Sequence, residues 1–181
     1  MAVVEEVSES ADSGGDLILW VLVWCELVAF GALLGGFMVM SFLHPESFSL
    51  AKLHLNGRLA SANTLVLITS SWLAAEAART RSERIMRLAL LGAAALGFAF
   101  VCVKLAEYGG ELRFVGDATF HAFFEFYFII TGFHLAHVAL LGLVMLIFAY
   151  RPGRSNVALV ATVWHVVTIV WLVIFPAVYL G

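Results

Sequence analysis

FFEFYFIITGFHLAH, which runs from Phe123 to His137, places a glutamate, a tyrosine, a threonine and two histidines inside an otherwise apolar run. An ionisable group in the core of a bilayer costs about 2.5–3.5 kcal/mol on insertion scales, so each one needs a reason. Other apolar runs also contain ionisable side chains, namely Glu26, Lys104, Glu107 and His165. Because lipid offers no hydrogen-bond partner, the pattern predicts membrane helices that bury polar groups against one another.

The composition is that of an integral membrane protein. Of the 181 residues, 62% are hydrophobic and 13% are charged, and the mean hydropathy is +0.99. A soluble domain carries about twice that share of charge. The net charge of −3 and the lack of a basic stripe exclude a nucleic-acid-binding protein. The length predicts one compact bundle.

Five apolar runs are long enough to cross about 30 Å of hydrocarbon, which takes roughly 20 helical residues. They cover residues 17–42, 59–78, 88–108, 120–150 and 157–180. Residues 1–16 contain five acidic and no basic side chains, the reverse of a signal peptide, and predict an acidic tail. We expect the third run to end at Gly109 and Gly110, where the connection to the fourth run begins. The predicted fold is therefore an all-α transmembrane bundle of five helices.

The charges of the connections predict the orientation. The side that holds the N-terminus carries six arginines, at positions 79, 81, 84, 87, 151 and 154. The opposite side carries only Lys52, Arg58 and Arg113. The positive-inside rule therefore places the N-terminus in the cytoplasm and the C-terminus outside. Arg79, Arg81, Arg84 and Arg87 are expected to meet anionic lipid head groups.

An inner polar layer follows from the helical rise of about 1.5 Å per residue, which sets the depth of each intruding group. Its members come from four different runs and are Glu26, Thr69, Ser70, His134 and His165. We expect Glu26, Ser70, His134 and His165 to form one polar cluster, and His137, one turn after His134, is a further buried polar candidate for proton handling. The bilayer favours the protonated form of a carboxyl, so Glu26 is either a proton-handling group or a neutral acid bonded to Ser70 or His134.

An outer polar layer lies near the opposite face. Lys104 and Glu107 are one turn apart on the third run, and His121 and Glu125 are one turn apart on the fourth. Asn63 of the second run lies at a similar depth. An unpaired ammonium in the bilayer is costly, so Lys104 is predicted to pair with Glu107 or Glu125.

The histidines raise the possibility of a metal or haem. His134 and His137 are spaced i, i+3 and could approach one small metal ion. They cannot both be axial ligands of one haem, because those ligands come from opposite sides of the porphyrin, so the second would be His165. The simpler interpretation is that these histidines are interhelical hydrogen-bond partners, because no third strong ligand stands at a fixed spacing. The sequence thus predicts no catalytic, metal or cofactor site within the chain.

Five segments in order resemble subunit III of the haem-copper oxidases, the cytochrome c oxidase polypeptide III family. They are GDLILWVLVWCEL (Gly15–Leu27), NTLVLITSS (Asn63–Ser71), KLAEY (Lys104–Tyr108), TGFHLAHV (Thr131–Val138) and WHVVTIVWLVIFPAVYL (Trp164–Leu180). The chain is most similar to the short five-helix branch associated with nitric oxide reductases. It departs from the family pattern in having Thr168 where an aspartate is usual, Gly142 one residue later than expected, and no counterpart of two N-terminal helices.

The resemblance implies a non-redox accessory subunit in the bacterial inner membrane. Its partner would be the catalytic subunit of a haem-copper oxidase or nitric oxide reductase, which would hold the haems and copper. In this family subunit III stabilises that partner, binds phospholipid and supports proton uptake, and Glu26 occupies the position of a carbodiimide-reactive glutamate. The rival hypothesis is a self-sufficient b-type haem or metal carrier that uses His134 or His137 with His165.

Overall fold

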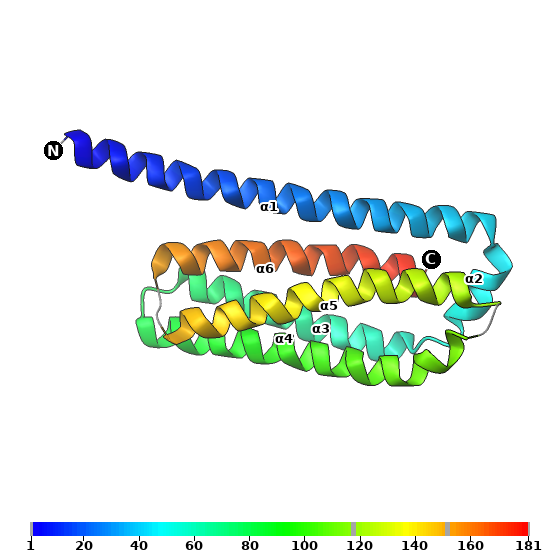
Figure 1. Cartoon of the computed structure of the whole chain (residues 1–181). Coiled ribbons are helices and arrows are strands. Elements are labelled where there is room, and N and C mark those ends of the chain that lie inside the picture. Colours follow the sequence, from blue (N-terminus) through cyan, green and yellow to red (C-terminus); the bar gives the residue numbers. More distant parts are fainter. Residues whose placement is uncertain (1, 117–118, 151–152, 181) are drawn as a thin grey trace.

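The computed structural model describes residues 2–116, 119–150 and 153–180, with the side chains of 2–19 and 22 left out, and all the regular secondary structure in these residues is helical (Figure 1). The α-helices are α1 (Ala2–Leu43), α2 (Pro45–Lys52), α3 (Gly57–Arg79), α4 (Glu83–Glu111), α5 (His121–Tyr150) and α6 (Arg154–Phe175). A 3₁₀ turn, η1 (Leu112–Phe114), follows α4, and a π-helical segment, η2 (Pro176–Leu180), follows α6.

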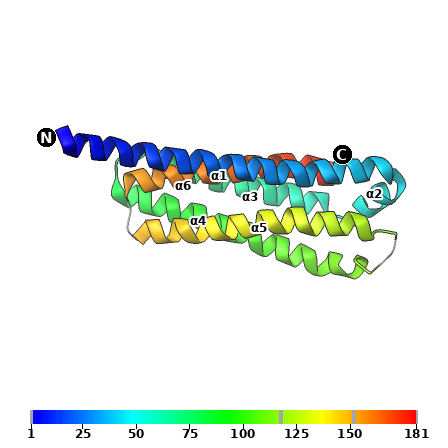
Figure 2. The same ribbon diagram turned by 45° about the horizontal axis from the view of Figure 1, so that its top comes forward.

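A four-helix bundle forms the body of the molecule, and α1 lies along its outside. Within the bundle α3 packs against α4 and α6, and α5 packs against the same two helices. α1 contacts α5 and α6, and its N-terminal part projects beyond the ends of the other helices (Figure 2). α2 crosses one end of the bundle and connects α1 to α3.

Two predicted helix ends were wrong. The first helix does not begin at residue 17, because α1 extends back to Ala2 through the backbone of the acidic segment. Gly109 and Gly110 do not open a connection, because α4 continues through both to Glu111. At Pro176 the type of helix changes. It lacks an N–H group and cannot continue the α-helical hydrogen-bond pattern, and the chain passes there into the wider turn of η2.

Four of the described helical segments are long and apolar enough to cross a membrane. They are Val23–Leu43, Glu83–Phe114, His121–Tyr150 and Arg154–Leu180. These segments make the chain a multi-pass membrane protein. The predicted span at 59–78 is not among them, although α3 forms there. Its apolar character is diluted by polar side chains that face the bundle, including the buried Asn63, Thr64 and Ser70.

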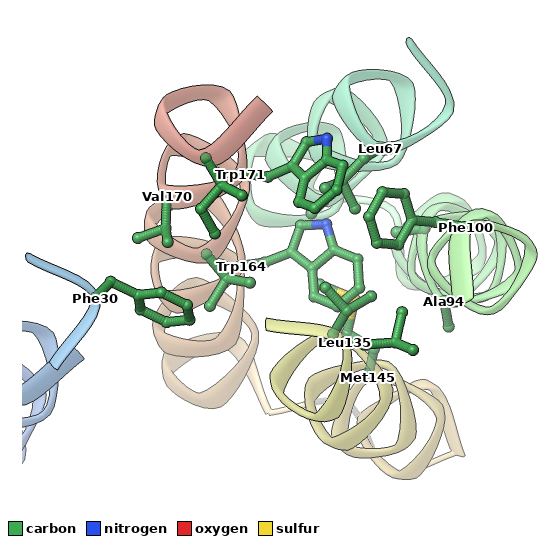
Figure 3. Close-up of a cluster of buried hydrophobic side chains, with 14 of the residues drawn as sticks. Phe30, Leu67, Ala94, Phe100, Leu135, Met145, Trp164, Val170 and Trp171 are labelled. Carbon is green, nitrogen blue, oxygen red and sulfur yellow. The ribbon is translucent and has the colours of Figure 1, made fainter. Parts of the chain in front are cut away.

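Two tryptophans of α6 occupy the centre of the bundle (Figure 3). Trp164 and Trp171 are both fully buried, and the Trp171 ring lies edge-on to Phe100 of α4 with ring centroids 4.9 Å apart. The indole Nε1 of Trp171 donates a hydrogen bond of 2.9 Å to Thr64 Oγ1 of α3. This bond pairs a polar group that lipid would leave unsatisfied.

Gly97 of α4 provides the space for Trp164. A Cβ built on Gly97 would lie 2.5 Å from the Cη2 atom of that indole. We therefore expect Gly97→Ala to lower the free energy of unfolding by about 1–3 kcal/mol, as overpacked cores do. Thermal unfolding in detergent, followed by circular dichroism, measures the change. Gly31→Ala is the matched control, because a Cβ there meets nothing within 4 Å. Equal effects at both glycines would contradict the close approach.

Candidate functional site

A carboxyl–imidazole pair joins α1 to α5 inside the membrane span. Glu26 Oε1 lies 2.6 Å from His137 Nε2, and the two side chains are only 12% and 21% exposed. The second carboxyl oxygen of Glu26 is buried without a hydrogen-bond partner. The rings of Phe30 and Phe133 cover the imidazole, with centroids 6.0 and 4.5 Å away. We call these two residues the Glu26–His137 pair.

The backbone determines where the mobile proton of this pair can reside. His137 Nδ1 lies 2.7 Å from the carbonyl oxygen of Phe133 one turn earlier. A carbonyl only accepts, so Nδ1 carries a hydrogen and donates it. Nε2 then either accepts from a protonated Glu26 or, as imidazolium, donates to the carboxylate. In both cases one proton is held between Oε1 and Nε2, so the pair can pass it from one atom to the other.

A small apolar cavity adjoins the pair. Its volume is about 120 Å³, and it lies between α1, α5 and α6. Besides Glu26 and His137, its lining consists of aliphatic side chains, namely Val23, Leu140, Leu141, Val163, Val166 and Val167. The low polarity of these walls strengthens the hydrogen bond of the pair.

The expected inner cluster is not formed, because Glu26 bonds to His137 and not to Ser70 or His134. Ser70 Oγ donates to the carbonyl of Ala93 on α4, at 2.7 Å. His165 Nδ1 contacts the carbonyl of Ala161 on its own helix, at 2.6 Å. Ser70 and His134 also lie at different levels of α4, because Ser70 bonds to Ala93 whereas His134 packs on Phe100, two turns further along.

His134 is fully buried among aromatic rings. Its ring stacks on Trp171 at a centroid distance of 5.0 Å, and Phe30 and Phe100 present their edges to it at 6.1 and 5.9 Å. Neither ring nitrogen has a hydrogen-bond partner. Thr168, for which the resemblance implies an aspartate in related proteins, donates to the carbonyl of Trp164 on its own helix. Thus Thr168 gives His165 no carboxylate partner.

The outer layer contains a second buried cluster, which we call the Lys104 cluster. It consists of Lys104, Glu107, Glu111, Tyr127 and Tyr179. As predicted, Lys104 pairs with Glu107, at 2.9 Å between Nζ and Oε2, and both side chains are almost completely buried. Tyr179 of η2 also donates to Glu107 Oε1, at 3.1 Å. The cluster thereby joins α4, α5 and the C-terminal segment.

The tyrosines and Glu111 were missed by sequence reasoning. Tyr127 lies six residues after His121 on α5, and Tyr179 lies near the C-terminus, so only the fold brings them to Lys104. A signal for Glu111 was available, since it is one turn beyond Glu107 on the same helix face. It was overlooked because Gly109 and Gly110 suggested that the helix had already ended.

The remaining predicted residues lie apart from both groups. Glu125 faces His121 at 3.9 Å, and both side chains are more than half exposed. Asn63 Nδ2 donates to the carbonyl of Phe100 at 3.1 Å and ties α3 to α4. The four arginines predicted to meet lipid are all exposed at the α3–α4 connection; they are Arg79, Arg81, Arg84 and Arg87. Arg151, which is among the six arginines expected on the cytoplasmic side, lies outside the described residues.

The contacts of His134 and His137 bear on the haem or metal hypothesis. No three His, Cys, Asp or Glu side chains come together in the part of the chain that the structure describes. His134 is enclosed by aromatic rings, and His137 is engaged at both ring nitrogens. A porphyrin between one of them and His165 would have to displace this packing.

Comparison with known proteins gives matches along most of the chain, although no family model matches it. It is 24% identical over 173 residues to a probable quinol oxidase subunit 3 of Staphylococcus saprophyticus, an alignment that covers 89% of this chain and 86% of that protein. It is 27% identical over 178 residues to a cytochrome c oxidase subunit 3 of Thermostichus vulcanus, covering 90% and 85%.

A third relative has higher identity over a shorter alignment. It is a probable cytochrome c oxidase subunit 3 of Rickettsia bellii, 29% identical over 140 residues, which are 65% of this chain and 46% of that protein. The resemblance of the five sequence segments therefore agrees with alignments to three subunit 3 proteins from different organisms. Over about nine-tenths of its length, the chain is therefore similar to subunit 3 proteins of the cytochrome c and quinol oxidases.

Proposed function

We propose that this chain is a non-redox accessory subunit that docks on the catalytic subunit of a respiratory haem-copper oxidase in the bacterial inner membrane. The observation that carries the proposal is the Glu26–His137 pair, a proton-holding group inside the membrane span of a subunit III relative. The haems and copper would belong to the partner. A nitric oxide reductase is the alternative partner, favoured by the likeness of the five sequence segments to the branch associated with such enzymes.

Five spans, with the N-terminus in the cytoplasm, are part of the proposal. α3 has 23 residues, which at 1.5 Å per residue is about 34 Å, enough to cross the hydrocarbon. It lies alongside α4 and α6, and its polar side chains bond inward, as those of Asn63 and Ser70 do. The exposed arginines of the α3–α4 connection support a cytoplasmic location for that end.

We further propose that phospholipid binds to the outer surface of the bundle. A second apolar cavity, of about 160 Å³, separates α1 from α6 and suits part of an acyl chain. It is lined by Leu27, Phe30, Gly31, Leu34, Ile169, Val170 and Val173. The exposed arginines at the α3–α4 connection would contact anionic head groups.

Purification in mild detergent tests the accessory role against the haem-carrier hypothesis. We expect the tagged chain to co-purify with a haem-containing catalytic subunit and to be colourless once separated from it. A Soret band with split α bands in the separated chain would overturn the proposal in favour of a b-type haem carrier. The identity of the co-purified subunit then distinguishes an oxygen reductase from a nitric oxide reductase.

Glu26→Gln is expected to leave assembly intact and to shorten the time for which the complex sustains its turnover. The amide keeps the shape and a hydrogen bond to His137 but cannot release a proton. A hydrophobic carbodiimide should label Glu26 in the parent chain, because the buried acid can be protonated, and should spare the exposed Glu83. Glu83→Gln is the control. A Glu26→Gln complex that matches the parent in turnover and durability would reduce the pair to a packing contact.

A further inference from the structure

Glu111 has a buried carboxyl that forms no ion pair. It lies on the last turn of α4 and is 3% exposed, and neither of its oxygens has a hydrogen-bond partner. Lys104 and Glu107 are within electrostatic reach of its carboxyl, and the hydroxyl of Tyr127 on α5 lies nearby. A carboxylate left without donors in such a place would carry a large desolvation cost.

Lys104 has no donor to spare for Glu111. A lysine ammonium carries three N–H groups. These three donors are matched by three acceptors, Glu107 Oε2 at 2.9 Å, Tyr127 Oη at 2.7 Å and Tyr179 Oη at 2.6 Å. The positive charge of Lys104 is also balanced by the carboxylate of Glu107, with which it forms a buried ion pair. A second negative charge in the cluster would therefore stand uncompensated.

We propose that Glu111 is a proton-binding site, in which the carboxyl is held as the neutral acid at neutral pH. The Lys104 cluster then holds one ammonium, one carboxylate and one carboxylic acid, and is neutral overall. The titratable groups that surround Glu111 are Lys104, Glu107 and Tyr108 of α4, Tyr127 of α5 and Tyr179 of η2. Glu107 is the counter-ion of Lys104 in the structure, and Glu111 is near enough to Lys104 for the two charges to interact, so it can take over that role.

This site is distinct from the Glu26–His137 pair. It is built from α4, α5 and η2, whereas the pair joins α1 to α5. The last turns of α4, the start of α5 and η2 lie at the end of the bundle that also holds α2 (Figure 1). The proposal does not depend on the accessory function, because it follows from the charges and hydrogen bonds of this chain alone.

Infrared spectroscopy of the purified full chain in detergent at pH 7 tests the proposal. A solvent-exposed carboxyl is ionised at this pH, so a carboxylic acid C=O band reports a protonated, sheltered group. We expect Glu111→Gln to remove one such band from the spectrum of the parent chain. Glu125→Gln is the control and should leave the band in place, because Glu125 is more than half exposed. A folded Glu111→Gln chain with no loss of acid signal would overturn the proposal.

Glu107→Gln tests whether the two carboxyls share the cluster's single negative charge. With an amide at position 107, Lys104 has only Glu111 left as a counter-ion, so Glu111 should ionise. The acid band should then disappear even though Glu111 is still present. Helical circular dichroism equal to that of the parent chain establishes that the variant is folded. If the band persists in folded Glu107→Gln, Glu111 is not coupled to Lys104, and the two carboxyls do not share one negative charge.

Discussion

Lys104→Met is expected to destabilise the folded bundle by roughly 3–5 kcal/mol, the usual cost of breaking a buried ion pair. The change leaves Glu107 without its cation and removes the hydrogen bonds that hold Tyr127 and Tyr179 to Lys104. Methionine fills much of the same volume, so the loss reports the charge and its bonds more than a cavity. Unfolding in detergent with a denaturing surfactant, followed by circular dichroism, gives the free energy.

Arg87→Met is the matched control for this experiment. Arg87 also pairs with a glutamate on its own helix, Glu83, but both side chains are exposed, at 47% and 64%. An exposed pair contributes only about 0–1 kcal/mol. If Lys104→Met cost no more than Arg87→Met, the Lys104 cluster would not be a stabilising element of the fold.

Trp171→Ala is the second change with a large expected effect, about 3–5 kcal/mol of lost stability. The side chain is fully buried between α3, α4 and α5, and the truncation would leave a cavity there. It would also leave Thr64 Oγ1 without its donor and uncover the ring of His134. The same unfolding measurement applies.

Trp72→Ala is the matched control, because it removes the same type of side chain from an exposed position. Trp72 lies on α3 and is 63% exposed, so its removal creates no cavity inside the bundle. We expect its effect to stay within about 0.5 kcal/mol, as for surface substitutions in general. Similar losses at Trp72 and Trp171 would mean that the centre of the bundle is not where Figure 3 places it.

Much of the fold could be predicted from the sequence because the bilayer restricts the choices. Apolar runs of about 20 residues predict helices, since only a helix satisfies its own backbone in lipid. The cores of the predicted runs fall within α1, α3, α4, α5 and α6. The ends were less reliable, because helical glycines such as Gly109 and Gly110 do not terminate a helix unless the surroundings require it.

The functional groups were only partly predictable. Lys104 and Glu107 are neighbours on one helix, so their spacing of three residues was enough to predict the pair. Glu26 and His137 are on different helices, and the sequence identified both residues as candidates without pairing them. The choice of His137 over His134 depends on which side of α5 faces α1, and a depth calculation contains no information on that rotation.

The sequence by itself determined that this protein is helical and membrane-spanning, which polar residues intrude, and which family it resembles. These properties depend on local composition and spacing, which the 1.5 Å rise and the thickness of a bilayer convert into structure. The tertiary structure alone decided that Glu26 meets His137, that His134 is sealed among aromatic rings, and that Tyr127 and Tyr179 complete the shell of Lys104. These contacts depend on how each helix is rotated and packed against its neighbours, which is settled by the fit of side chains such as Trp164 against Gly97.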